Sequence, residues 1–415
     1  MSPDQALLLD LLGRSPAAAL HATPADLEGA LRLATPNLRP YLHWQLESSG
    51  LIERLSSVMV ADLGAARRAS ILMHLQRRAA FKRIATAFEE RGLRVMVVKG
   101  MALAHLAYPE AALRSMSDID LWVNPADLPA ADLALKAAGL DYPARTHAGL
   151  QLPTAEEALA ERSYEVPGTP VLVEMHGALK SYAALSAQRL ELIWRRSQVT
   201  ELDGIPARVQ HPEDLLLHLC LHAADQHRFS LGLSPLLDVH RAATRWHDAF
   251  DWPAMIADWS ALGVSAWMYL VLKVARDLLG APLPDRFFRT MSAPSALEEL
   301  EALAQEQIWQ PAGHLPPALE RWYGAPSRAG WIWHRLGAYT TREPGTPWWR
   351  QGGVMGRRLV HDLAVKAPRY VRGWMDGHLR GAELHERASL ARGRQRLGEL
   401  IADEEGPKHW RRPPV

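Results

Sequence analysis

Two aspartates separated by one apolar residue open a short hydrophobic run, Asp118-Ile119-Asp120-Leu121-Trp122-Val123. This pattern predicts a strand over 118–123, and in a strand residues i and i+2 point to the same face. The carboxylates of Asp118 and Asp120 would therefore lie side by side, while Ile119 points into the core. Neighbouring carboxylates repel each other unless a cation lies between them, so few folds can accommodate such a strand.

The segments around this strand change between helical and strand periodicity. The predicted elements are a helix over 58–91 closed by Gly92, a strand over 94–98, a helix over 101–108, the strand over 118–123, a helix over 125–138 with Asn124 as N-cap and Gly139 at its end, and a hairpin that pairs 163–166 with 171–175. Helical patterns resume after Pro212. The chain is thus predicted to be α+β, with a small mixed-sheet core flanked by large N- and C-terminal helical regions.

Composition shifts divide the chain into four predicted regions. These are an N-terminal helical region over 1–92, the mixed-sheet core over 93–210, a helical region closing a cleft over 211–326, and a basic helical region over 327–415. The last region has 17 Lys and Arg against 9 Asp and Glu, with interleaved Trp331, Trp333, Trp348, Trp349 and Trp374. Basic and aromatic residues together can contact nucleic acid or an acidic partner. A helical cap with buried tryptophans and solvated arginines is favoured, because no RNA-binding motif accompanies them.

Charge and cysteine content exclude several classes of protein. The formal net charge is +1 with neutral His, so the chain as a whole is not a binder of polyanions. A single cysteine, Cys220, cannot form an internal disulfide, which favours the reducing cytoplasm. No apolar run reaches the roughly 18 residues that span a bilayer, and Asp4 and Asp10 with no preceding basic residue argue against a signal peptide. The motifs of P-loop kinases, dinucleotide-binding oxidoreductases and serine hydrolases are missing from the sequence.

A third carboxylate, Glu174, interrupts the apolar strand Val171-Leu172-Val173-Glu174-Met175. A charge inside such a run needs a partner, and a metal ion shared with Asp118 and Asp120 would supply one. Carboxylates together with substrate phosphates are the usual ligands of Mg²⁺. The alternative interpretation of the Asp-Ile-Asp triplet is two surface aspartates at a strand edge.

The run VMVVKGMALAHLAYPEAALRSMSDIDLWVNPADLPAADLALKAAGL, followed by VLVEMHGAL and LHLCLHAADQHRFSLGLSPLLDVHRA, resembles an uncharacterised nucleotidyltransferase family of the DNA polymerase β-like superfamily. The resemblance covers most of residues 58–290. It implies that Asp118 and Asp120 bind two Mg²⁺ ions that bridge the phosphates of a nucleoside triphosphate, with ATP as the expected nucleotide. It also implies that Glu174 completes the second metal site and helps to deprotonate the acceptor, and that pyrophosphate is released.

Two pairs of residues are expected to contact the triphosphate. Lys99-Gly100 stands where the broader superfamily has Gly-Ser; Gly100 permits close backbone approach, the helix start favours anions and Lys99 could add a phosphate contact. Arg114 and Ser117 precede the carboxylates and are also phosphate-contact candidates. For these two, a surface ion pair and a strand-entry position are equally good interpretations.

Histidines form a further group of candidates. His176 follows Glu174 by two residues and would face the same side, either orienting a substrate or lying at the cleft rim. The resemblance includes His222, His227 and Asp238, which implies that they line or brace the cleft. His218 and His222 share a helix face, but no accompanying ligand spacing supports a zinc site.

The acceptor is left open by the sequence. Relatives of this family occur beside peptide-natural-product genes, so the resemblance suggests a peptide, a small molecule such as an aminoglycoside-like sugar, or a protein side chain. Two other functions compete with nucleotidyl transfer to such an acceptor. One is a non-catalytic nucleotide- or partner-binding protein, against which the complete set of three carboxylates argues. The other is addition of nucleotides to RNA ends by means of the basic C-terminal region.

Overall fold

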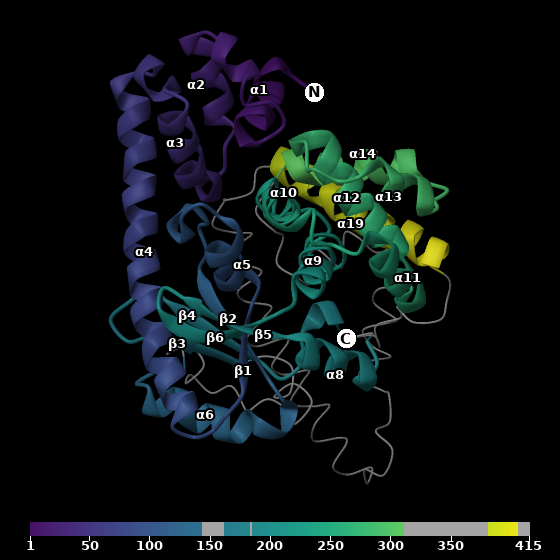
Figure 1. Ribbon diagram of the computed structural model, residues 1–415. Helices are drawn as coiled ribbons and strands as arrows, with labels where there is room; N and C mark the ends of the chain where they lie inside the picture. The colour runs from purple at the N-terminus through teal and green to yellow at the C-terminus, as the bar shows by residue number, and fades with distance from the viewer. Residues whose placement is uncertain (143–161, 183–184, 311–380, 406–415) are drawn as a thin grey trace. The chain divides into compact units, whose positions relative to one another are not determined.

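The computed structural model describes residues 1–142, 162–182, 185–310 and 381–405 (Figure 1). These residues form two compact units. The larger unit takes in the described residues of 1–227 and 231–297 together with 402–405, and the smaller takes in 228–230, 298–310 and 381–401. None of the described helices is both long and apolar enough to cross a membrane.

The smaller unit consists mainly of α14 (Leu297–Trp309) and α19 (Gly381–Glu405). Buried polar contacts join the two helices. Gln307 Nε2 donates to the carbonyl of Leu390 at 3.1 Å, and Arg394 Nη1 donates to Gln307 Oε1 at 2.8 Å. Because Gln307 is fully buried, these hydrogen bonds hold one alignment of the helices.

Four helices open the larger unit, and side-chain caps define where several of them begin. Ser2 and Gln5 form a capping box on the first helix, and the Ser56 hydroxyl accepts from the backbone N–H of Met59 at the start of the fourth. The elements are α1 (Pro3–Leu12), η1 (Ala18–His21), α2 (Pro24–Arg32), η2 (Pro36–Leu38), α3 (Arg39–Ser48), η3 (Leu51–Arg54) and α4 (Ser57–Glu89). The long predicted helix is thereby confirmed, and Gly92 follows it with φ +62°.

A six-stranded sheet lies at the centre of the larger unit, in the order β3-β4-β2-β1-β6-β5. Its strands are β1 (Val95–Val98), β2 (Asp118–Val123), β3 (Arg162–Glu165), β4 (Leu172–His176), β5 (Gln198–Leu202) and β6 (Ile205–Val209). β1 is antiparallel to β2 and parallel to β6, β2 is parallel to β4, and β3/β4 and β5/β6 are antiparallel pairs. A mixed sheet flanked by helices confirms the α+β prediction, including the hairpin across 167–170.

One face of this sheet packs against α4 and α6 (Leu128–Ala137), which lie alongside it in Figure 1. The strands contribute Val97, Ile119, Leu121, Val123, Val173 and Met175 to this core. Residues alternate between faces along a strand, so Asp118, Asp120 and Glu174 point to the opposite face. The core on one side therefore determines where the carboxylates lie.

Shorter elements connect the strands and continue the larger unit. They are α5 (Lys99–Ala107), η4 (Ala111–Leu113), η5 (Pro125–Asp127), η6 (Lys180–Tyr182), α8 (Ala187–Arg196), α9 (Pro212–Leu221), the π-helix η7 (His222–Gln226), α10 (Ser234–Trp246), α11 (Trp252–Leu262), α12 (Ser265–Leu279) and α13 (Asp285–Thr290). α9, α10 and α12 pack against one another, and α10 also contacts α5. As predicted, Asn124 caps the helical segment after β2, where its side chain accepts from the N–H of Ala126.

Two features of the fold differ from the sequence predictions or lie beyond them. The β5/β6 hairpin was not predicted, because its strands are short and β5 is largely polar; the Asp203-Gly204 pair between them was the available turn signal. α5 begins at Lys99, two residues before the predicted start.

The tryptophans from Trp331 to Trp374, on which the C-terminal prediction depends, lie outside the described residues.

Candidate active site

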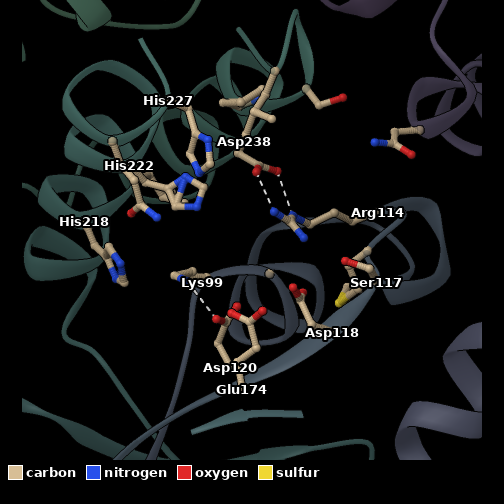
Figure 2. Close-up of a pocket in the computed structure, with 18 of the residues that line it drawn as sticks. Lys99, Arg114, Ser117, Asp118, Asp120, Glu174, His218, His222, His227 and Asp238 are labelled. Atoms are coloured by element: carbon tan, nitrogen blue, oxygen red, sulfur yellow. Dashed lines mark hydrogen bonds and ion pairs between the residues drawn. The ribbon is translucent and has the colours of Figure 1, made fainter. Parts of the chain in front are cut away.

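The parallel pairing of β2 with β4 brings the predicted carboxylates together. Asp120 is in register with Glu174, and Asp118 and His176 follow on the same face by the alternation of their strands. Figure 2 shows Asp118, Asp120 and Glu174 pointing into one pocket. Two distant segments of the chain thus supply one cluster of negative charge.

Asp120 is the most enclosed of the three carboxylates, with 4% of its surface exposed. Its Oδ1 atom accepts from Lys99 Nζ at 2.7 Å and from His176 Nε2 at 2.9 Å. Burial alone would raise the pKa of Asp120, but the hydrogen bond from His176 and the charge of Lys99 outweigh it and hold the pKa well below its usual range. Asp120 is therefore ionised at neutral pH.

Asp118 is in a different electrostatic environment. Burial and the neighbouring charge of Asp120 raise its pKa, against the opposing effects of Lys99 and the Ser117 hydroxyl. The negative charge of the cluster is thus only partly compensated by protein cations, which is the condition that a bound metal ion relieves.

The cluster also has ligand atoms at metal-binding separations. One ligand atom each from Asp120, Glu174 and His176 lies within 4.8 Å of the others. His176 Nε2 donates to Asp120, so the imidazole orients this carboxylate, and the same nitrogen is 3.8 Å from Glu174 Oε2. Asp118 does not belong to this closely spaced group, and its predicted role as a ligand stays a prediction. Carboxylate oxygens suit Mg²⁺, and the residues present therefore fit the implied ion.

Lys99 and Gly100 form the junction between β1 and α5. Lys99 has φ +50°, in the left-handed region that non-glycine residues rarely adopt, and its side chain reaches across to Asp120. A Cβ atom at Gly100 would lie 2.3 Å from Arg114 Nη1, so only glycine lets the guanidinium approach the helix start this closely. The junction thus presents a lysine, an arginine and helix N–H groups to the same space.

Arg114 is held by a buried acid on α10. Its Nε and Nη2 atoms donate to the two carboxylate oxygens of Asp238 at 2.8 and 2.7 Å (Figure 2). Tyr108 Oη also donates to Asp238, at 2.7 Å. A bidentate pair of this kind fixes the orientation of the guanidinium. Arg114 is accordingly no surface ion pair, since only 18% of its side chain is exposed.

Histidines from α9 and η7 line another part of the pocket (Figure 2). Gln210 Nε2 donates to Tyr182 Oη, so Gln210 Oε1 must accept from His218 Nδ1 at 3.0 Å. The Nε2 atom of His218 is then an unprotonated acceptor, buried without a hydrogen-bond partner. Burial, and secondarily the charge of Lys99, lowers the pKa of His218 to about 3, so the ring is neutral at physiological pH.

The rings of His222, which begins the π-helical turn, and His227, which follows it, lie with centroids 4.5 Å apart and planes tilted by 37°. Burial lowers the pKa of His222 well below its ordinary value, with His227 adding to the effect. The zinc alternative gains no support, because no metal-ligating trio among the described residues includes His218 or His222. A turn of π-helix is frequent at functional sites, since it re-aims the side chains on it.

The three carboxylates, the Lys99–Gly100 junction, Arg114 and the histidines line one cavity of about 630 Å³, within the size range of small-molecule sites. This cavity is lined by every residue that the sequence analysis predicted for the catalytic, metal or phosphate-contact site, namely Lys99, Gly100, Arg114, Ser117, Asp118, Asp120, Glu174, His176, His222, His227 and Asp238. It also contains residues that sequence reasoning did not assign to it, among them Asn37, His218, Gln226 and Ser234. His218 had a usable signal in its i, i+4 spacing with His222; Asn37 had none, because it comes from the N-terminal helices.

Comparisons with known proteins show the family to which the chain belongs. Neither curated proteins nor solved structures include a match to the chain. Residues 23–280 match the family model described as "Uncharacterised nucleotidyltransferase", which covers more than half of the chain and every residue gathered in the cavity. The chain therefore belongs to this nucleotidyltransferase family.

Proposed function

We propose that this protein is a Mg²⁺-dependent enzyme that transfers a nucleotidyl group from a nucleoside triphosphate, with ATP as the expected donor, to an acceptor and releases pyrophosphate. The observation that carries the proposal is the pairing of Asp120 with Glu174 across β2 and β4, in a cavity that also holds Lys99 and Arg114. Acidic ligands for a metal ion and basic contacts for phosphate thus share one site.

In this proposal Asp118, Asp120 and Glu174 hold Mg²⁺. When bound, the ions stabilise the charge on the entering and leaving oxygens of an in-line displacement at the α-phosphorus. A bond forms between the acceptor oxygen and the α-phosphorus while the bond to the β-phosphate oxygen breaks. The electron pair of that bond leaves with pyrophosphate.

The residues of the chain have separate tasks. Lys99, the N–H groups at the start of α5, and the clamped Arg114 bind and orient the triphosphate. Glu174 accepts the proton of the acceptor hydroxyl. His218, a neutral hydrogen-bond acceptor, orients a hydroxyl or amino group of one of the substrates.

The dimensions of the cavity bear on the acceptor. About 630 Å³ accommodates a nucleotide together with a small molecule or with one side chain or terminus of a peptide. A peptide natural product or a small molecule is accordingly the proposed acceptor class.

The test is to incubate the protein with each labelled nucleoside triphosphate, Mg²⁺ and either cell extract or the peptide encoded by a neighbouring gene. A mass increase of a whole nucleotide is expected on the acceptor. Asp120→Asn and Glu174→Gln should each lower the rate by more than about a hundred-fold, a loss typical of removing one charge-stabilising group. Asp248→Asn, which changes an exposed carboxylate that contacts His247, should leave the rate unchanged.

Thermal unfolding distinguishes the competing functions. Nucleotide should stabilise the wild-type protein only when Mg²⁺ is present, by about 2.7 kcal/mol at one hundred times Kd. Metal-independent stabilisation that persists in Asp120→Asn would instead support a non-catalytic binding protein. A mass increase of phosphate alone would contradict nucleotidyl transfer, and activity only on RNA ends would replace the proposed acceptor class.

A further inference from the structure

A second cluster of potential metal ligands lies in the larger unit, among residues that do not line the cavity. His74 on α4, His105 on α5 and Asp203 in the β5–β6 turn each offer a ligand atom, and these atoms all lie within 4.8 Å of one another. His74 Nε2 is 2.9 Å and His105 Nε2 is 3.2 Å from the same oxygen, Asp203 Oδ2. Three elements that are far apart in the sequence thus direct their polar atoms at one point.

The protonation of His105 makes this convergence unusual. His105 Nδ1 is 2.8 Å from the carbonyl oxygen of Met101, which can only accept, so Nδ1 carries the proton. In a neutral ring the lone pair is then on Nε2, an atom that is buried and makes no hydrogen bond. Only 7% of the side chain is exposed, so water offers little compensation. A bare lone pair that faces a carboxylate oxygen is repulsive, and either a proton on Nε2 or a metal ion between the two atoms removes the repulsion.

His74 is also suited to binding a cation. Burial of its ring lowers the pKa of His74 against the opposing charge of Asp203, and the nearby charge of Arg77 adds to the lowering. The ring is therefore mostly neutral near pH 7, which is the form that binds metals.

The spacing of the three atoms agrees with metal coordination. Nitrogen and oxygen ligands lie about 2.0–2.1 Å from Zn²⁺, so two ligands of a tetrahedral site are roughly 3.3 Å apart. The separations of 2.9 and 3.2 Å are close to this value. His105 also has the partner that metal-bound histidines usually have, since its other ring nitrogen donates to a backbone carbonyl.

The turn that carries Asp203 is built to hold it in place. Asp203 and Gly204 have φ +50° and +75° and connect paired residues Leu202 and Ile205, as in a two-residue hairpin turn. Arg78 Nη2 donates to the carbonyl of Asp203 at 3.1 Å, while its Nε atom is 3.7 Å from Oδ2. Arg78 is half-exposed and brings a positive charge near the Asp203 carboxylate.

We propose that His74, His105 and Asp203 form a second metal site, selective for a borderline divalent cation such as Zn²⁺, with water as the fourth ligand. Two imidazoles and one carboxylate favour such ions over Mg²⁺, which prefers an all-oxygen shell. The bound ion would join α4 and the β5–β6 turn to α5, the helix whose first residues are Lys99 and Gly100. It would therefore brace the helix that begins at the active site and take no part in the reaction.

The probe is Co²⁺ alone, added to the full-length protein after removal of metals by chelation. Uptake of one equivalent with the visible absorption of a tetrahedral ion is expected. Asp203→Asn should weaken this binding by at least about ten-fold. Asn is among the residues that best tolerate a left-handed backbone, so the turn should survive this substitution.

Co²⁺ binding by variants of the two metal-ligand clusters shows which cluster holds the ion. His105→Gln should abolish the spectrum, whereas Asp120→Asn, which alters the other carboxylate site, and His247→Gln, at a surface His–Asp pair, should leave it intact. Zn²⁺ without nucleotide should raise the unfolding temperature of the wild type and not that of Asp203→Asn. The proposal is overturned if Co²⁺ does not bind, if its binding is unchanged in Asp203→Asn, or if Asp120→Asn removes it. These outcomes are independent of nucleotidyl transfer.

Discussion

Gly100 is a residue at which a single methyl group should disturb the site. The position where a Cβ would be is only 2.3 Å from Arg114 Nη1. Arg114 cannot move freely away, because Asp238 holds its other two nitrogens. The position of Arg114, a proposed phosphate contact, therefore depends on the absence of a side chain at Gly100.

Gly100→Ala should destabilise the protein by about 1–3 kcal/mol, as overpacking typically does, and should raise KM for the nucleotide because Arg114 is displaced. Urea unfolding and steady-state kinetics measure the two effects. Gly64→Ala is the matched control, since Gly64 is also helical but faces the flexible end of Arg68 at 3.2 Å. That variant should be neutral or more stable by up to about 1 kcal/mol. Equal behaviour of the two variants would show that the Arg114 contact does not matter.

At the scale of elements, the site depends on Asp238 of α10, whose carboxylate accepts hydrogen bonds from the segment that follows α5. Asp238 accepts from both Tyr108 and Arg114, residues that precede it by 130 and 124 positions. Two buried hydrogen bonds from a guanidinium are stronger than one from a phenol. The orientation of Arg114 is therefore determined by how α10 packs, and the local sequence around Arg114 does not determine it.

Asp238→Asn should raise KM for the nucleotide by about ten-fold or more, because a charged hydrogen bond contributes about 1.5–3 kcal/mol. Tyr108→Phe is the control: it removes the other partner of Asp238 and leaves the arginine pair, so KM should hardly change. Unfolding midpoints of both variants separate loss of fold from loss of positioning. If Tyr108→Phe raised KM as much as Asp238→Asn, the clamp on Arg114 would not be the cause.

At the scale of the whole molecule, buried neutral histidines should make stability depend on pH. Burial lowers the pKa of His218 to about 3 and that of His240 to about 4, whereas an unfolded histidine titrates near 6.5. Below about pH 6.5 the unfolded chain binds protons that the folded chain does not, so stability falls as pH falls toward these values.

The urea midpoint should accordingly be lower at pH 5.5 than at pH 7.5. Carboxylates with a lowered pKa, such as Asp120, titrate further down, whereas burial raises the pKa of Asp118, which acts against the effect of the histidines. His218→Gln should reduce the dependence, whereas His247→Gln, at a half-exposed histidine, should not change it. An identical midpoint at both pH values would contradict the burial of neutral rings.

Much of the fold and of the site could be predicted from local pattern. The alternation of Asp118, Ile119 and Asp120 determines which side chains share a face, and it placed the carboxylates opposite the core. The β5/β6 hairpin was missed because its exposed edge is polar and lacks the apolar alternation of the central strands.

By itself, the sequence determined the α+β class, the shared face of the aspartates and the family, because these depend on neighbours within a few residues. Only the tertiary structure decided which distant groups meet. The Lys99–Asp120 contact, the Arg114–Asp238 pair and the His74–His105–Asp203 cluster all join separate elements. No period or spacing encodes such contacts, since they arise from how helices pack on the sheet. The aspartates and the candidate cations Lys99 and Arg114 were visible in the sequence, and only the fold showed which groups these cations contact.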